Sequence, residues 1–468
     1  MSSRSYRFIL LIALLAMAAM PLSCSCGDDD DDDDDDAGDD DDDDGDPGDV
    51  EGVECDTEVE GLCVLTGVIT ESFTMTTDFQ WLLRGGVFIG NDTDETVLSI
   101  DPGVQIFGES STNGMLVITR GSRLEAEGTA DEPIVFSSSK LDGERARGDW
   151  GGLIINGRAP INNCTTDTEA FCEAIGEGGT GSFGGSDPDD NSGTLNYVRV
   201  EFAGRLISPD NELNGIAFQG VGRGTTVDYI QVHMNKDDGV EFFGGTVNAK
   251  HVVVTGVADD GIDWTDGWQG RLQFGVVQQY EDGGDQGIEA DNNAEDNTAT
   301  PRSHPIISNV TLIGSPDSEF SDLGMLLREG TAANLSNVVV KGFNEAGLMI
   351  DHNETFDNAW AAKDLNGELT LTNSIIDCDT TTEEPELDDA PPFTVADFFS
   401  DLNDGNDASD PMIADPYNQT SPDFTLDAGS PALSGAVVPS DSFFDEVDFI
   451  GAFGTENWAS GWTTSAPN

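Results

Sequence analysis

Acidic residues recur at one fixed position of a repeat in the middle of this sequence. The second residue after a repeated glycine is Glu241, Asp263 and Glu289 in three successive copies. Further aspartates stand directly before the glycines of the same copies. Carboxylates without neighbouring cysteines are oxygen ligands, which suit calcium rather than zinc or copper. The pattern therefore predicts a Ca²⁺ site made by Asp237, Asp238, Glu241, Asp259, Asp260, Asp263, Asp285 and Glu289.

Two other interpretations of these carboxylates stay open. Aspartates in tight turns commonly accept hydrogen bonds from nearby backbone, so turn structure alone also explains the pairs before the glycines. The other interpretation is catalysis, in which clustered acids act together with a basic side chain. The candidate bases on the same copies of the repeat are Lys236, Lys250, His251 and Arg271.

The repeat that positions the carboxylates has a period of 22 to 26 residues over most of its length. Its glycines lie 24, 22, 26, 37 and 23 residues apart. The first and third residues after each glycine are nearly all apolar, which places them on one face of a short strand. A second strand with alternating apolar residues precedes most copies. The repeated glycines are Gly215, Gly239, Gly261, Gly287, Gly324 and Gly347.

Two or three short strands in each period form one turn of a parallel β-solenoid, in which equivalent positions stack at about 4.8 Å. Propeller blades take about 40–50 residues each, and a sandwich would need hairpin turns at regular spacing. The sequence therefore predicts an all-β fold, a right-handed parallel β-helix, with the apolar pair of each copy inside.

Outward carboxylates one turn apart repel by roughly 0.9 kcal/mol in water, and a bound cation would relieve that repulsion.

The N-terminus has the three-part pattern of a secretory signal peptide, which we assign to residues 1–23. Two arginines precede an apolar run that is too short to span a membrane, and small residues follow it. Cys24 comes after Pro21-Leu22-Ser23, which resembles the lipobox at which bacterial lipoproteins are acylated. We expect a lipid anchor on Cys24, and Ser25 behind it favours the outer membrane.

The rest of the chain divides by composition. Residues 24–49 are dominated by aspartate and are predicted to form a disordered acidic tether. The formal net charge of the chain is −72, and because so acidic a surface repels phosphate backbones, no nucleic-acid partner is expected. Residues 50–378 contain the β-helix. Residues 379–468 lose the repeat and are predicted to be an irregular C-terminal cap, in which Trp458 and Trp462 cover the last coil.

The cysteines include two local pairs in loop-like stretches. Cys55 and Cys63 are eight residues apart, and so are Cys164 and Cys172. In an exported chain such pairs are typical of disulfides, and neither spacing fits the tight motif of a zinc site. We therefore expect two disulfides, and Cys378 has no evident partner.

Several stretches resemble known β-helix proteins. LSIDPGVQIFG, LVITRGSRLEAEGTADEPIVFSSS and WGGLIING are similar to the opening coils of pectin-lyase-like right-handed β-helix proteins. SPDFTLDAGSPAL and DFIGAFGTENWASGW resemble the C-terminal region of uncharacterised bacterial surface lipoproteins with a β-helix. The resemblance covers roughly residues 62–468. It implies the fold and not an activity, because the superfamily includes lyases, glycosidases, adhesins and passive spacers.

From these patterns we expect a lipoprotein of the outer membrane, displayed on the cell surface, that binds Ca²⁺ and an extracellular glycan or another cell-surface ligand without catalysis. The alternative is a calcium-dependent polysaccharide lyase of the pectin-lyase-like type, in which a base removes the C5 proton beside a uronate. Polygalacturonase-like Asp-Asp-Gly occurs twice, but the Gly-His-Gly and Arg-x-Lys motifs of those glycosidases do not. A spacer without a ligand of its own is the third hypothesis.

Overall fold

The computed structural model describes most of the chain after the acidic tract. The predicted signal peptide, the predicted acylation site Cys24 and nearly all of the predicted acidic tether lie outside the described residues, so those assignments stay predictions. The described residues are 47–56, 61–167, 171–207, 212–361 and 368–468.

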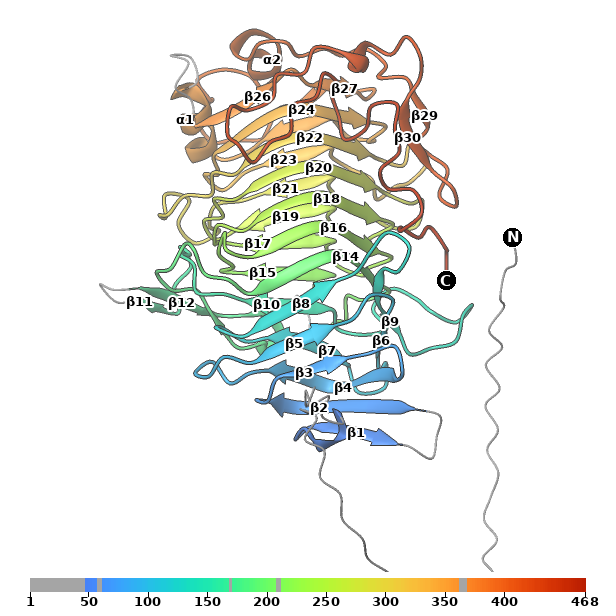
Figure 1. Ribbon diagram of the computed structural model, residues 1–468. Coiled ribbons are helices and arrows are strands. Elements are labelled where there is room, and N and C mark those ends of the chain that lie inside the picture. The colour runs from blue at the N-terminus through green and yellow to red at the C-terminus, as the bar shows by residue number, and fades with distance from the viewer. Residues whose placement is uncertain (1–46, 57–60, 168–170, 208–211, 362–367) are drawn as a thin grey trace, which may run out of the picture. The chain divides into compact units, whose positions relative to one another are not determined.

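The described chain winds into successive coils whose strands pair in one 25-stranded sheet (Figure 1). Every pairing in that sheet is parallel except the one between β1 and β2. This is a parallel β-helix, as the repeat predicts. From β14 onward a short strand alternates with a long one. The short strands are β15 Ile216–Gln219, β17 Val240–Phe243, β19 Ile262–Thr265, β21 Ile288–Ala290, β23 Met325–Leu327 and β25 Leu348–Ile350. The long strands are β14 Gly193–Glu201, β16 Thr226–His233, β18 Asn248–Thr255, β20 Arg271–Gln278, β22 Ile306–Ile313 and β24 Ala333–Lys341.

The coils before β14 are less regular, and the first strand runs against the second. β1 pairs with β2 in antiparallel fashion, and its Cys55 lies opposite Cys63. The early strands are β1 Val53–Asp56, β2 Leu62–Ile69, β3 Phe73–Met75, β4 Gln80–Ile89, β5 Val97–Ile100, β6 Gln105–Gly108, β7 Met115–Ile118, β8 Arg123–Glu127, β9 Ile134–Ser138 and β10 Leu153–Asn156. A short 3₁₀ turn, η1 Pro47–Asp49, precedes them.

The interior is built from the two apolar positions that follow each repeated glycine. Phe218 pairs with Phe242, and Phe242 pairs with Trp264 on the next coil. The rings of Phe218 and Phe242 stack with centroids 5.3 Å apart, and both side chains are fully buried. Burial of such columns removes large apolar areas from water, which is the main favourable term for a solenoid. The inward columns therefore confirm the predicted stacking.

The repeated glycines are required by close packing at one corner of each coil. A Cβ added at Gly261 would lie 2.5 Å from Cγ1 of Val277 and 2.7 Å from the carbonyl oxygen of Gly287. A Cβ at Gly239 would meet Val254 and the carbonyl of Gly261 in the same way. Such distances are far inside van der Waals contact, so any side chain would force the coils apart.

The C-terminal end of the helix is covered by two helices. Phe356 of α1 Asn353–Ala361 and Phe398, just after α2 Val395–Asp397, are fully buried and belong to the same core as the coils. Both contact Phe393, whose ring centroid is 5.3 Å from that of Phe356. The last strands of the sheet are β26 Leu369–Thr372, β27 Ile375–Asp377 and β28 Thr382–Glu383, and the helical turn that follows α2 is η4 Phe398–Leu402.

The expectation that Trp458 and Trp462 cover the last coil is wrong. The segment that follows η4 packs against the outer face of β18 to β27, in a second apolar layer with Val253, Val276 and Val339. Trp462 is buried edge-on against Tyr229 in the middle of the helix. The outward apolar residues on that face are buried from water by this segment. Its elements are β29 Ile413–Asp415, β30 Asp423–Leu426 and the 3₁₀ turn η5 Pro431–Leu433.

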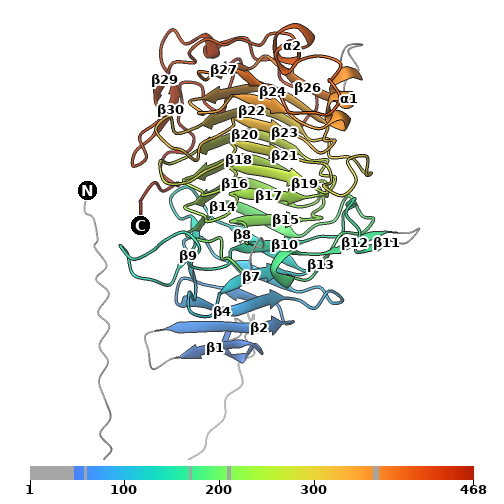
Figure 2. The ribbon, with the colours of Figure 1, turned by 180° about the vertical axis from the view of Figure 1, so that it is seen from behind.

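A long insertion leaves the coils between β10 and β14. Figure 1 and Figure 2 show its strands β11 and β12 projecting sideways from the stack. The insertion contains β11 Thr166–Asp167, β12 Cys172–Ile175, the turn η2 Glu177–Gly179 and β13 Ser182–Phe183. It packs apolar side chains such as Phe183 on the outer face of the coils, beside Ile154 and Ala217.

Candidate functional site

The predicted outward column of carboxylates is present in the register of the short strands. Glu241 pairs with Asp263, and Asp263 pairs with Glu289. The equivalent positions before them are the apolar Ile154 and Ala217, covered by the insertion. After them the column continues with Leu326 and Met349, which pack in another outer apolar cluster. Three acids are thus enclosed between two apolar patches.

A second acidic column stands at the corner before the glycines. The backbone N–H of Asp322 donates to the carbonyl of Asp285, and that of Glu345 donates to the carbonyl of Asp322, so both residues extend this corner. Three groups of carboxylates offer oxygens within 4.8 Å of one another. The groups are Asp237 with Asp238 and Asp259, Asp238 with Glu241 and Asp263, and Asp259 with Asp260 and Asp285.

Two of the corner aspartates also accept hydrogen bonds from backbone, although not from the backbone of their own turn. Oδ1 of Asp238 accepts the backbone N–H of Asp260 at 3.0 Å. Oδ1 of Asp260 accepts the backbone N–H of Gln286 at 2.6 Å. Each aspartate therefore bonds the next coil rather than its own turn, and its second oxygen is left for another ligand.

The ends of the outward column have polar partners outside the column, whereas one oxygen of its central residue has no partner. Glu241 accepts a hydrogen bond from the side-chain amide of Asn214. Glu289 forms an ion pair with Arg328, which also pairs with Asp291 at 2.9 Å. Between them Asp263 is 8 % exposed, and its Oδ1 has no hydrogen-bond partner. An unpartnered buried carboxylate oxygen is costly, so the centre of the column is where a cation would stabilise most.

Burial, followed by repulsion from neighbouring acids, raises the pKa of all eight predicted ligand carboxyl groups. Burial is the largest cause for Glu241, and neighbouring Asp263 and Asp238 add to it, which places its pKa well above the usual range. Burial likewise raises the pKa of Glu289 to about 8, although Arg328 opposes the shift. Burial followed by Asp259 raises the pKa of Asp237 to about 8. Without a cation, Asp237 and Glu289 therefore hold protons near neutral pH.

Glu241 and Asp263 of the outward column line one wall of a pocket of about 280 Å³. Glu177 of the insertion, Asp266 and Glu329 complete the ring of acids, and Phe243 contributes an aromatic wall. Burial is the main cause that raises the pKa of each of these three carboxyl groups to about 7. Arg328 is the only basic residue among the described residues that line this pocket.

The comparison with protein families decides what kind of chain this is. The sequence model of the "Pectate-lyase like beta helix domain" family matches residues 67–463, which include every residue of both acidic columns. The chain belongs to this family. Searches of curated proteins and of solved structures returned no match. Membership of the pectate-lyase-like β-helix family explains the coils, but it assigns no role to the carboxylates.

Three of the four candidate bases of this pectate-lyase-like chain lie away from the acidic columns. Lys250 pairs with Asp445 at 2.7 Å, and Arg271 pairs with Asp441 at 2.6 Å. His251 contacts Asp228 and packs against Trp458 of the C-terminal segment. The long strands carry these three residues on a different side of the coil from the short strands. Only Lys236 stands at the acidic corner, 3.6 Å from Glu212.

Both expected disulfides are formed in this pectate-lyase-like protein. Cys55 is bonded to Cys63 beside the first coil, and Cys164 is bonded to Cys172 in the insertion. Cys378 is a free thiol, as its sequence context suggests. The second disulfide restricts the loop that carries the insertion across the outer face of the coils. No helix among the described residues is long and apolar enough to cross a membrane.

Several residues of the acidic pocket escaped the sequence analysis. Asp291 lies two positions after Glu289, so strand alternation could have placed it on the same face. Arg328 follows its strand β23 directly, at the equivalent place one coil further on. Glu177 comes from the insertion, which has no repeat, and no sequence signal places it here.

Proposed function

We propose that this protein is an exported, non-enzymatic surface β-helix whose acidic columns bind Ca²⁺. The observation that carries the proposal is the group formed by Asp238, Glu241 and Asp263. Their carboxylate oxygens lie within 4.8 Å of one another, and all three side chains are buried. Two oxygens on opposite sides of one Ca²⁺ are about 4.8 Å apart, because Ca–O distances are about 2.3–2.6 Å. The group therefore fits a single calcium ion.

The surroundings also favour calcium over a transition metal. The described residues of the group and of the adjoining pocket offer oxygen atoms, and neither cysteine nor histidine lines the pocket. Ca²⁺ takes six to eight oxygens and accepts irregular geometry. Asn214 has a buried side-chain oxygen without a partner, and its amide already contacts Glu241. That oxygen and water from the pocket would complete the coordination shell.

Export and anchoring belong to the same proposal. The predicted signal peptide, the lipobox-like Pro21-Leu22-Ser23-Cys24 and the acidic tract support a lipoprotein held in the outer membrane, with the β-helix displayed on the cell surface. Two disulfides agree with an oxidising compartment. The ligand beyond calcium is proposed to be an extracellular glycan or another cell-surface molecule.

A binding role is favoured over the lyase because the candidate bases are engaged elsewhere. Three of them are ion-paired along the C-terminal segment or the long strands. The lyase alternative depends on Lys236, which stands beside the acidic corner and is partly exposed. Incubation with uronate polysaccharides tests it, since elimination creates a carbon–carbon double bond that absorbs in the ultraviolet. Product that disappears in Lys236→Ala would replace the binding role with the lyase.

Isothermal titration of the purified protein with CaCl₂ tests the calcium site. The acidic tract binds weakly in every variant, so the informative quantity is the difference between variants. Asp263→Asn should remove the tightest binding event while keeping the shape of the side chain. Asp189→Asn, a charge-matched change at an exposed position paired with Arg223, should leave it unchanged. Identical titrations for wild type and Asp263→Asn would end the proposal.

A further inference from the structure

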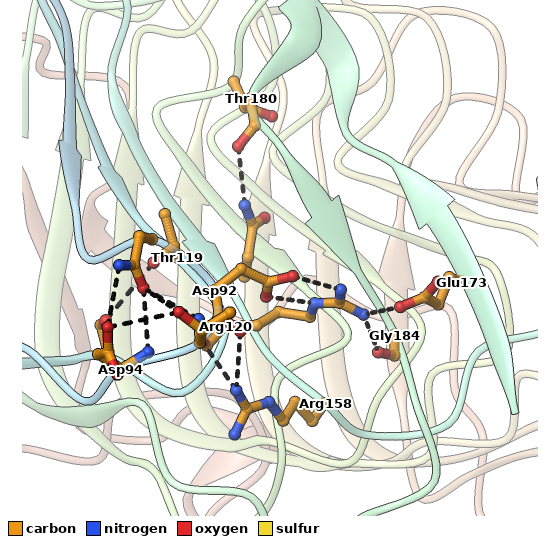
Figure 3. A network of polar contacts seen from close by, with 12 residues as sticks. Asp92, Asp94, Thr119, Arg120, Arg158, Glu173, Thr180 and Gly184 are labelled. Atoms are coloured by element: carbon orange, nitrogen blue, oxygen red, sulfur yellow. Dashed lines mark hydrogen bonds and ion pairs between the residues drawn. The ribbon is translucent and has the colours of Figure 1, made fainter. Parts of the chain in front are cut away.

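A second pocket lies away from the acidic columns, where the insertion meets the early coils. It has a volume of about 300 Å³ and is lined by Phe171, Glu173 and Ser186 of the insertion and by arginines from the coils. Figure 3 shows the centre of this region, with Arg120 between Asp92 and Glu173 and with Arg158 beside it. The pocket differs from the acidic one because basic and acidic side chains nearly balance.

Arg120 holds the pocket together. Its guanidinium donates to both carboxylate oxygens of Asp92, at 2.7 and 2.6 Å. It also donates to Glu173 and to the carbonyl of Gly184, so it links the loop after β4 with the insertion. All of its nitrogen atoms have acceptors. Four of its five N–H groups are used in this way, so Arg120 is a structural clamp.

Arg158 differs from Arg120 in how many of its nitrogen atoms have acceptors. Its Nη2 donates to the backbone carbonyls of Asp92 and Arg120, each at 3.3 Å. Its Nε and Nη1 find no acceptor among the described residues, and the side chain makes no ion pair there, in a chain with 91 acidic and 19 basic residues. A guanidinium group carries five N–H donors, so this arginine keeps the N–H groups of Nε and Nη1 available for a ligand.

The position of Arg158 is set by Gly121. A Cβ at Gly121 would lie 2.5 Å from Nη2, 2.7 Å from Cζ and 2.7 Å from Nη1 of Arg158. The face of the guanidinium therefore rests on the glycine backbone, which has a positive φ of 79°. Two carbonyls and this flat contact hold the group in place without a direct salt bridge to any described residue.

We propose that this pocket binds one neutral pyranose residue of a glycan. A sugar ring has an apolar face that packs on an aromatic side chain, and Phe171 at the pocket is 38 % exposed. Sugar hydroxyl groups can accept hydrogen bonds from Nε or Nη1 of Arg158, and they can donate to Asp187, which also lines the pocket. The carboxylates of Asp92, Glu173 and Asp187 would repel a uronate. The inference rests on the proposed glycan-binding role and gives it a location separate from calcium.

Ligand-observed saturation-transfer NMR with neutral oligosaccharides tests this site. The probes are cello-, xylo-, manno- and galacto-oligosaccharides, and oligogalacturonate is the anionic comparison. At least one neutral probe should bind the wild-type protein, with and without a calcium chelator. Arg158→Gln should weaken that binding at least tenfold, and so should Gly121→Ala, which keeps the charge but displaces the guanidinium. Arg123→Gln removes an exposed arginine paired with Glu95 and should leave binding unchanged.

Three outcomes would overturn the inference. They are no binding of any neutral probe to folded wild-type protein, binding that survives both Arg158→Gln and Gly121→Ala, and Arg158-dependent binding of oligogalacturonate alone. Loss of binding when calcium is chelated would indicate that the glycan binds at the calcium site instead. Because the calcium titration and this experiment use different variants, either proposal can fail without the other.

Discussion

Glu241 and Asp263 are direct register partners on β17 and β19, and both carboxylates point out of the coil into one pocket. Parallel stacking makes this proximity unavoidable, since equivalent positions of adjacent coils are only about 4.8 Å apart. A solenoid that places acids at the same position of successive turns concentrates negative charge in a line. The neighbouring apolar clusters then keep water from screening that charge.

The stability of the calcium-free protein should fall as pH rises from about 6.5 to 8.5. Burial raises the pKa of Glu289 and Asp237 to about 8, whereas both ionise near pH 4 in the unfolded chain. A raised folded-state pKa gives stability that is present at low pH and lost as pH rises through the folded value. Thermal unfolding followed by circular dichroism should therefore show a falling midpoint. Saturating Ca²⁺ should abolish the decrease.

The pH range from 6.5 to 8.5 excludes the range in which His233 would change the stability in the opposite direction. Burial lowers the pKa of His233 to about 4, so this histidine reduces stability only below its ordinary value near 6.5. Above that pH it is neutral in both states and contributes nothing to the slope. A midpoint that rises with pH between 6.5 and 8.5 in a chelator would contradict the buried, protonated carboxyl groups.

Calcium binding at pH 7 should release protons. The carboxyl groups of Asp238, Glu241 and Asp263 have pKa values well above normal because they are buried beside one another. A divalent cation binds the ionised forms, so the protons must leave. Titrations in buffers with different ionisation enthalpies should give apparent binding enthalpies that differ in proportion. Equal enthalpies in all buffers would show that the groups were already ionised.

Arg328→Gln should destabilise the calcium-free protein by about 3 kcal/mol, because it leaves two buried carboxylates without their positive partner. The guanidinium pairs with Glu289 and Asp291 at the end of the outward column. Urea denaturation with and without Ca²⁺ measures the effect. The variant should also gain more stability from calcium than wild type does. Arg84→Gln, at an exposed pair with Glu109, serves as the control and should change little.

Gly261→Ala should destabilise the fold by about 1–3 kcal/mol or more through overpacking. The added methyl group meets Val277 and the carbonyl of Gly287 at distances no real Cβ adopts. Gly275→Ala is the matched control on the inner wall, where the closest atom is the side-chain Cδ2 of Leu272 at 3.1 Å. Equal stability of the two variants, measured by urea denaturation, would show that the corner glycine is not required by packing.

Trp462→Ala should cost about 3–5 kcal/mol, as expected for a large side chain that is fully buried. The indole packs edge-on against Tyr197 and Tyr229 on the outer face of the coils. Loss of this anchor should also make the C-terminal segment accessible to protease before the coils unfold. Trp462→Phe should retain much of the stability. Unchanged proteolysis in Trp462→Ala would mean that the segment does not depend on this contact.

The repeat allowed most of the coil to be predicted, and the reason is geometric. Because strand alternation and a constant period fix the register, Phe242 and Trp264 could be placed inside and Glu241 and Asp263 outside from sequence alone. Non-repeating segments follow no such rule. The path of Trp462 along the side of the helix is set by outward valines such as Val253. Strand alternation does not indicate which segment packs on these valines.

The acidic site was predictable only in part for the same reason. Seven of the eight predicted ligands fall in the three carboxylate groups, and the eighth, Glu289, is paired with Arg328. That arginine belongs to the next coil, and no motif marks it as a partner. Glu177 reaches the pocket from the insertion, and its position depends on the packing of Phe183 against Phe243.

The most direct test of the calcium proposal is to locate the ion. A crystal structure of the protein grown with saturating CaCl₂ should show an anomalous difference peak coordinated by Asp238, Glu241 and Asp263. The metal–oxygen distances should be about 2.3–2.6 Å, and Asp263→Asn crystals should lack the peak. A wild-type map at saturating calcium with only water or no density between these three carboxylates would contradict the account.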